Sequence, residues 1–180
     1  MQKYNFDLTS NDLSLLNASF LAEAASLVGE DLNQINGRIC DDLGFTSYVP
    51  LEDKDIDTQA FIAANEQMIV LSFRGTTTLE DCRTDLKIKL VPSLIGRVHC
   101  GFNNALDHIW NSMKQAILDL RNKDQSIWIT GHSLGGALAT LAVDRLTEEA
   151  IDVGGLYTFG QPCVGDKVFA KNFNDKMQAY

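Results

Sequence analysis

Apolar residues recur along the chain with regular spacings, and the spacing predicts the kind of element. The clearest case is Gly101–Arg121, where apolar residues follow i, i+3, i+4 and i+7 spacing with Asn, Asp, Lys and Gln between them. The Ala- and Leu-rich stretch Leu13–Val28 has the same helical spacing, and Gly29 follows it where a C-cap glycine is expected. We therefore predict a long helix in each of these two places.

Three shorter segments have weaker helical patterns. Ala137–Leu146 is rich in Ala and Leu, and Val168–Met177 is amphipathic. A further short helix is expected around Asp31–Leu43, where the periodicity is less regular. The sequence therefore predicts five helices in all.

Short apolar runs bounded by polar residues predict four strands. Thr58–Ala64 and Met68–Phe73 are separated by three polar residues, which is typical of a hairpin. Ser126–Thr130 and Gly155–Phe159 alternate with the predicted helices. Nearly continuous apolar strands that alternate with helices are typical of a mostly parallel sheet covered by helices on both faces. The fold class is therefore predicted as α/β, with the hairpin adding an antiparallel edge.

Composition and charge narrow the class of protein. The 180 residues fit one domain spanning the whole chain, and 45% hydrophobic and 22% charged residues are usual for a globular protein. The chain has 24 Asp and Glu residues but only 15 Lys and Arg residues, and because of this acidic excess a nucleic-acid partner is not expected. No apolar run reaches the ~20 residues of a transmembrane helix. The first residues lack a signal-peptide pattern, which favours a cytoplasmic location.

The cysteines and histidines give no metal-binding pattern. The four cysteines are far apart and contain no CxxC pair, which argues against a zinc ribbon or a thioredoxin-type site. Without a signal peptide they are expected to be reduced and mostly packed. Three scattered histidines do not suggest a metal site. We expect neither a metal nor an organic cofactor.

The segment 131–135 matches the GxSxG pattern, with Ser133 at its centre. It follows a predicted strand and precedes a predicted helix, which is the context of a nucleophile elbow. The tight turn requires glycine two positions either side of the serine, and the helix N-terminus brings unpaired N–H groups and partial positive charge. Ser133 is therefore predicted to be a nucleophile, with the Leu134 amide stabilising an oxyanion. The alternative, a phosphate-binding turn, needs a longer glycine pattern such as GxGxxG, which is absent here.

A second oxyanion donor is expected in a loop after an earlier strand. Gly75 allows the backbone to turn after Phe73, and Thr76 offers both an N–H and a hydroxyl. Asp85, nine residues further on, is placed to hold that hydroxyl. The alternative interpretation of this segment is a polar surface turn.

Four segments, in this order and spacing, resemble the class 3 lipase family, the fungal-type triacylglycerol lipases. They are Met68–Leu86, Val98–Phe102, Ile129–Ala139 and Tyr157–Asp166. The resemblance implies an α/β-hydrolase core and hydrolysis of a lipid or small carboxylic ester, with a lipid–water interface as one setting. It implies Ser133 as nucleophile, Thr76 and Leu134 as oxyanion donors and Asp85 as support of the oxyanion hole. It also implies that the segment from Thr77 to about Leu90 is a lid.

The lid segment departs from the family pattern. Leu79 is the main apolar residue of its first turns, and Cys82 stands where an aromatic residue is common. Glu80, Asp81 and Arg83 make the segment polar. This composition argues against strong interfacial activation and a preference for long-chain triglycerides.

The triad is the larger departure. In α/β-hydrolases the order along the chain is Ser, then Asp or Glu, then His, and no histidine follows Ser133. His132 adjoins the nucleophile, His99 is expected to pack and hydrogen-bond, and His108 is expected on a helix surface. Asp166 belongs to a family motif other than the catalytic acid. The acid and base are therefore expected beyond Tyr180, in a C-terminal part of the fold that these 180 residues lack, and the 180 residues alone are expected to be nearly inactive.

Three hypotheses about function follow from the sequence. The first is a serine ester hydrolase in which a lipid or carboxylic ester acylates Ser133 and water then releases the acid. The second is a non-catalytic protein that uses the hydrolase fold to bind lipid or a protein partner. The third, a structural α/β domain with a fortuitous elbow, has to explain four family motifs as coincidences. The sequence does not fix acyl-chain length, the alcohol or the oligomeric state.

Overall fold

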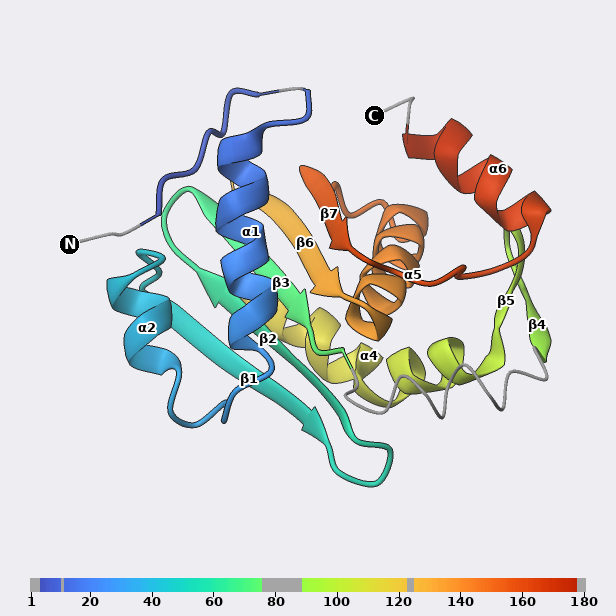
Figure 1. Ribbon diagram of the computed structural model, residues 1–180, viewed down its shortest axis with the longest axis horizontal. Coiled ribbons are helices and arrows are strands. Elements are labelled where there is room, and N and C mark those ends of the chain that lie inside the picture. The colour runs from blue at the N-terminus through green and yellow to red at the C-terminus, as the bar shows by residue number, and fades with distance from the viewer. Residues whose placement is uncertain (1–3, 11, 76–88, 123–124, 178–180) are drawn as a thin grey trace.

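Five strands form the central sheet of the protein. The computed structural model describes residues 4–10, 12–75, 89–122 and 125–177. The strands are β1 (Ser47–Asp53), β2 (Thr58–Ala64), β3 (Met68–Phe73), β6 (Ser126–His132) and β7 (Gly155–Phe159). They lie in the order β1-β2-β3-β6-β7 (Figure 1). The first two neighbouring pairs are antiparallel and the last two parallel, so only β2 opposes the common direction. The predicted mostly parallel sheet with a leading hairpin is confirmed.

Helices cover both faces of this sheet. On one face lie α1 (Leu15–Leu27) and α2 (Asn36–Asp41), in front of the sheet in Figure 1. On the other face lie α4 (Cys100–Leu120) and α5 (Leu134–Glu148). The alternation of side chains along each strand divides the core in two, since Ile69 and Leu71 pack with α4 and α5 while Met68 and Val70 pack with α1 and α2. This is the predicted layered α/β arrangement.

The predicted stripe on α4 is the face that packs on the sheet. Five residues at helical spacing are buried: Phe102, Leu106, Ile109, Met113 and Ile117. The helix begins where the ring Nδ1 of His99 accepts a hydrogen bond of 3.1 Å from the Gly101 N–H, which makes His99 its N-cap. The packing and hydrogen-bonding role expected for His99 is therefore observed.

Sequence patterns missed three strands and overextended one helix. β1 and the separate hairpin of β4 (Leu90–Ser93) and β5 (Gly96–His99) lack regular apolar alternation. Leu51 is the one buried residue of β1, and Val98 is the one buried residue of the hairpin strands. In place of the predicted helix from Asp31, the Asp31 carboxylate accepts the Asn33 N–H at 3.0 Å, so the chain turns before α2 begins.

The last described helix, α6 (Lys167–Met177), lies beside β5 rather than over the main sheet (Figure 1). Phe169 and Phe173 are its buried residues. The Asp166 carboxylate accepts the Phe169 N–H at 2.9 Å and the Arg97 Nε–H at 3.1 Å, so it caps α6 and joins it to β5. These hydrogen bonds, the backbone one first, lower the pKa of Asp166. Asp166 therefore has a structural role, which agrees with its assignment to a motif other than the catalytic acid. Among the helices that the structure describes, none is long and apolar enough to cross a membrane.

Candidate active site

Ser133 occupies a sharp turn between β6 and α5. Its backbone has φ 54° and ψ −123°, a conformation that residues with a Cβ rarely adopt, and the residue is buried. The Ser133 N–H donates to the Phe159 carbonyl at 2.8 Å, and the Ser133 carbonyl accepts from the Gly136 N–H at 3.0 Å. The turn is thus held by β7 on one side and by the first turn of α5 on the other. This is the geometry of a nucleophile elbow.

The two glycines of the GxSxG pattern are required by close backbone contacts. A Cβ on Gly131 would lie 2.3 Å from the carbonyl carbon of Gly135. A Cβ on Gly135 would lie 2.1 Å from the carbonyl oxygen of Phe73, at the end of β3. These contacts allow α5 to start directly against the ends of β3 and β6. The steric reason inferred from the sequence for these glycines is confirmed.

Leu134 is the first residue of α5 and is half-buried. The first N–H groups of a helix have no intrahelical partner and carry the positive end of the helix dipole. A negative charge that develops on an oxygen next to Ser133 would therefore meet this helix N-terminus. The arrangement suits the oxyanion role predicted for the Leu134 amide, which stays a prediction.

The loop after β3 reaches the elbow through Gly75. A Cβ on Gly75 would lie 2.7 Å from the His132 carbonyl oxygen and 3.4 Å from the Ser133 Cβ. The backbone just before Thr76 is therefore in direct contact with the turn that carries Ser133. Thr76 and Asp85 themselves, and residues 77–88 of the predicted lid, lie outside the described residues.

The three histidines have distinct surroundings. His132 is exposed, and its Nε2 would lie 3.8 Å from a Cβ on Gly160. The His99 ring packs on Phe102 with 4.2 Å between ring centroids, and burial lowers the pKa of His99. The His108 Nδ1 lies 3.0 Å from an Asp53 carboxylate oxygen on the outside of α4. The placements predicted from the sequence for His99 and His108 agree with these contacts.

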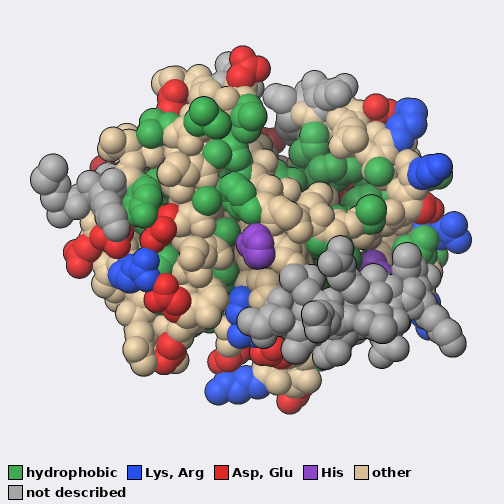
Figure 2. All heavy atoms as spheres, viewed as in Figure 1, with side chains coloured by type: hydrophobic (Ala, Val, Ile, Leu, Met, Phe, Trp, Pro, Cys, Tyr) green, Lys and Arg blue, Asp and Glu red, His purple; other side chains and the backbone are tan. Residues whose placement is uncertain are grey.

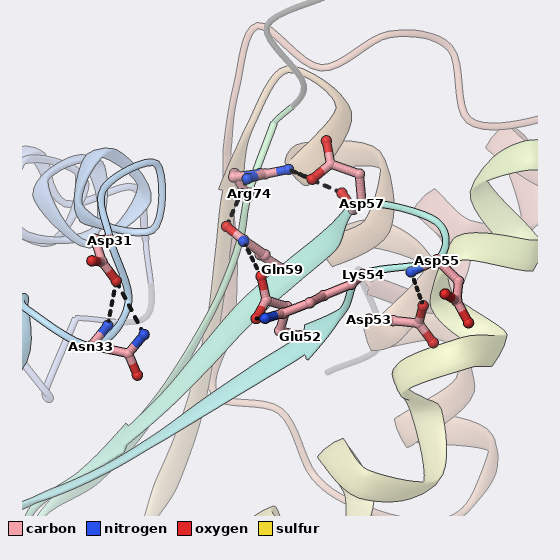
Figure 3. Close-up of polar contacts among 9 residues, drawn as sticks. All are labelled: Asp31, Asn33, Glu52, Asp53, Lys54, Asp55, Asp57, Gln59 and Arg74. Carbon is pink, nitrogen blue, oxygen red and sulfur yellow. Dashed lines mark hydrogen bonds and ion pairs between the residues drawn. The ribbon is translucent and has the colours of Figure 1, made fainter.

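A polar cluster that no sequence pattern predicts lies next to the elbow. It consists of Glu52 on β1, Asp57 in the turn after it, Gln59 on β2, and Arg74, which directly follows β3 (Figure 3). Its one signal in the sequence is an arginine directly before Gly75. The partners of this arginine depend on strand pairing, so the sequence alone could not identify them.

Two surface features lie away from the elbow. A cavity of about 650 Å³ borders Ser126 and Gly155, at the starts of β6 and β7, whereas Ser133 follows the end of β6. Apolar side chains gather over α1 in Figure 2, where Leu13 and Leu15 are 79% and 83% exposed.

Cys40, Cys100 and Cys163 are free thiols. Within the described ranges, no three His, Cys, Asp or Glu side chains group as metal ligands.

Comparison with known proteins places these features in a family. The model of the family described as lipase (class 3) matches residues 70–180. A lipase of Rhizomucor miehei is 37% identical in an alignment 125 residues long, and this alignment covers 63% of this chain and 34% of that protein. Secreted mono- and diacylglycerol lipase 1 of Fusarium solani is 33% identical in an alignment 118 residues long, which covers 62% of this chain and 35% of that protein. The chain thus spans about a third of the length of these curated relatives.

Solved structures give the same fold. The Rhizomucor miehei lipase propeptide complex superposes with a TM-score of 0.71 at 25% identity, over 87% of this chain and 55% of that one. The mono- and diacylglycerol lipase of Aspergillus oryzae has a TM-score of 0.76 at 21% identity, over 92% and 69% of the two chains, which supports the fold alone. The family match therefore coincides with the elbow and the sheet that carries it: the chain belongs to the class 3 lipase family and has the α/β-hydrolase fold.

Proposed function

We propose that the protein is a serine-dependent carboxylic ester hydrolase of the lipase or esterase type. The observation that carries the proposal is the strained backbone of Ser133, held between β6 and the N-terminus of α5. Strain of this kind persists where the surrounding structure enforces it and is concentrated at functional sites. The names of the relatives, a lipase and a mono- and diacylglycerol lipase, support lipid esters as the substrate class.

In the proposed reaction, the Ser133 Oγ attacks the ester carbonyl carbon while a general base takes the hydroxyl proton. The carbonyl oxygen becomes an oxyanion that accepts hydrogen bonds from the Leu134 N–H and from Thr76, whose hydroxyl Asp85 supports. Collapse of this intermediate releases the alcohol, which takes the proton from the base, and leaves an acyl group on Ser133. Water then attacks the acyl-enzyme by the same route and releases the acid.

The general base of this reaction is proposed to be a histidine beyond Tyr180, paired with an acid that precedes it. The contacts of His99 and His108 support this placement, because His99 caps α4 and His108 pairs with Asp53. Reading the coding sequence past residue 180 tests the proposal directly. An Asp followed by a His would support it, whereas a stop codon would favour a non-catalytic protein.

The nucleophile is tested in the full-length protein with p-nitrophenyl esters of short and long acyl chains. Ser133→Ala should lower kcat by at least about 10³-fold, as loss of a triad nucleophile does. Ser93→Ala is a matched control, since its hydroxyl bonds the Gly96 carbonyl in the β4–β5 hairpin. A fluorophosphonate should label the wild-type protein and the control at Ser133, detected by peptide mass spectrometry. Turnover retained in Ser133→Ala would contradict the proposal.

The oxyanion role is tested by Thr76→Val. Loss of an oxyanion donor acts on the transition state, so kcat should fall by about 10²-fold while KM stays the same. The backbone N–H of residue 76 is still present in Thr76→Val, so a loss of kcat smaller than this would also agree with the proposed role. A change in KM alone would place Thr76 in the substrate pocket instead.

A further inference from the structure

We propose that Gln161 is a positioning residue for the nucleophile Ser133. Its side chain is hydrogen-bonded to the Thr140 hydroxyl and so holds the loop after β7 against α5, close to the point where β7 accepts the Ser133 N–H. This inference rests on the proposed ester-hydrolase function. It adds a residue that has no role in the proposed chemical steps.

The backbone bond that holds Ser133 lies at the very end of a strand pair. The parallel pairing of β6 with β7 ends at His132 and Phe159. The Ser133 N–H donates to the Phe159 carbonyl at 2.8 Å, one step beyond this pairing. Within the described ranges it is the last backbone hydrogen bond between the two segments. Bonds at the end of a ladder open more readily than bonds inside it, so this one depends on what holds the chain after Phe159.

After Phe159 the chain turns directly onto α5, which lies beside β7 (Figure 1). Gly160 has φ 61°, a left-handed conformation that favours glycine. The next residue, Gln161, comes so close to the first turn of α5 that a Cβ on Gly136 would lie 2.8 Å from the Gln161 Cβ. The approach is possible because residue 136 has no side chain. Gln161 therefore lies over the helix turn in which the Gly136 N–H donates to the Ser133 carbonyl at 3.0 Å.

One side-chain hydrogen bond fixes Gln161 in this place. The Thr140 hydroxyl, one turn further along α5, lies 2.8 Å from the Gln161 Oε1 and 3.0 Å from the Gly136 carbonyl oxygen. A hydroxyl has a single proton, so these two acceptors share it. Thr140 is buried on a helix that packs on both β6 and β7, whereas Gln161 is exposed. The bond therefore ties an exposed loop residue to a packed helix next to Ser133.

Loss of this bond should affect the position of the loop more than the stability of the fold. Without Gln161 the Thr140 hydroxyl still has the Gly136 carbonyl as acceptor, so no buried polar group loses its last partner. The loop, in contrast, depends on the bond, because within the described ranges residues 160–163 make no other hydrogen bond.

The expected size of the effect follows from the position of the bond. At an active site a misplacement of about 1 Å costs roughly 10²-fold in rate. Loosening the end of a ladder that otherwise stays paired is a smaller disturbance. We therefore expect a loss of about 10-fold in kcat when the bond is removed.

The test compares Gln161→Met and Thr140→Val in the full-length protein, since each removes one partner of the bond. Each should lower kcat for a p-nitrophenyl ester by about 10-fold with KM within about twofold of the wild-type value. The double variant should lose no more than either single variant, because both break the same bond. Thr140→Ser keeps the hydroxyl and should have the wild-type kcat. Thr147→Val is a matched control on α5 that should also keep it, because the buried Thr147 hydroxyl bonds the Val143 and Asp144 carbonyls of its own helix.

Amide hydrogen exchange followed by NMR measures the bond at Ser133 without turnover. Exchange of the Ser133 N–H should be about 10-fold faster in Gln161→Met than in the wild-type protein and unchanged in Thr147→Val. Unchanged exchange or unchanged kcat in Gln161→Met overturns the inference, and so does an equal loss of kcat in Thr147→Val. Failure of the proposed function is a separate result: turnover retained in Ser133→Ala refutes the ester hydrolase, whatever the exchange rate in Gln161→Met.

Discussion

Replacing Gly135 with alanine tests whether the elbow depends on backbone contact between α5 and β3. The new Cβ would lie 2.1 Å from the Phe73 carbonyl oxygen, whereas ordinary contact begins at 3.4 Å, so the two elements would have to separate by about 1.3 Å. Both sides of this contact are backbone, which cannot rotate away as a side chain can. Since α5 packs directly on β3 and β6, the separation would also loosen core contacts. We expect a loss of about 3 kcal/mol in the free energy of unfolding, at the upper end of the usual cost of overpacking.

Gly37→Ala is the matched control, because a Cβ on Gly37 in α2 meets nothing within 4 Å. There the higher helix propensity of alanine should raise the free energy of unfolding by about 0.5–1 kcal/mol. Urea unfolding followed by tryptophan fluorescence measures both variants against the wild-type protein. If Gly135→Ala is as stable as the wild-type protein, the close approach of α5 to β3 is refuted.

Two further predictions concern a helix cap and a buried ion pair. Burial lowers the pKa of His99, so the unfolded chain binds a proton more readily than the folded one, and stability should fall as the pH drops below about 6.5. His99→Asn keeps a capping acceptor for the Gly101 N–H without this titration, and its thermal midpoint should decline less between pH 7 and pH 5; an equal decline would contradict the assignment. Lys176→Met should cost about 2 kcal/mol in urea unfolding, because it removes the cation 3.1 Å from the buried Asp144 carboxylate. The double variant with Asp144→Leu should recover most of this loss, and no recovery would show that the ion pair is not the cause.

The central strands and the long helix α4 could be predicted from the sequence because their burial is either continuous or regularly spaced. Every residue of β3 is buried, so Met68–Phe73 is an apolar run interrupted only by Ser72. α4 buries one stripe, so its period is visible in the sequence. β1 is different, because it lies at the edge of the sheet and buries Leu51 alone. A strand that forms mainly through backbone pairing leaves no apolar pattern to read.

In the candidate site, too, some residues could be identified from the sequence and others only from the tertiary structure. Ser133 and its two glycines could be identified from five consecutive residues, because the sterics of the elbow are local and depend on residue type. The support of Arg74 depends on the antiparallel pairing of β2 with β3, which brings Gln59 to a residue fifteen positions later in the chain.

The sequence by itself determined the layered α/β fold, the elbow and the family resemblance, since each depends on local periodicity or on a short motif. The tertiary structure alone decided that the β1–β2 turn contacts the residue after β3, and that Gly75 lies against Ser133. It also decided that His99 caps α4 and that His108 pairs with Asp53. These contacts join residues far apart in the chain. Their geometry depends on strand register and helix packing, which the free energy of the whole core sets and no short stretch of sequence encodes.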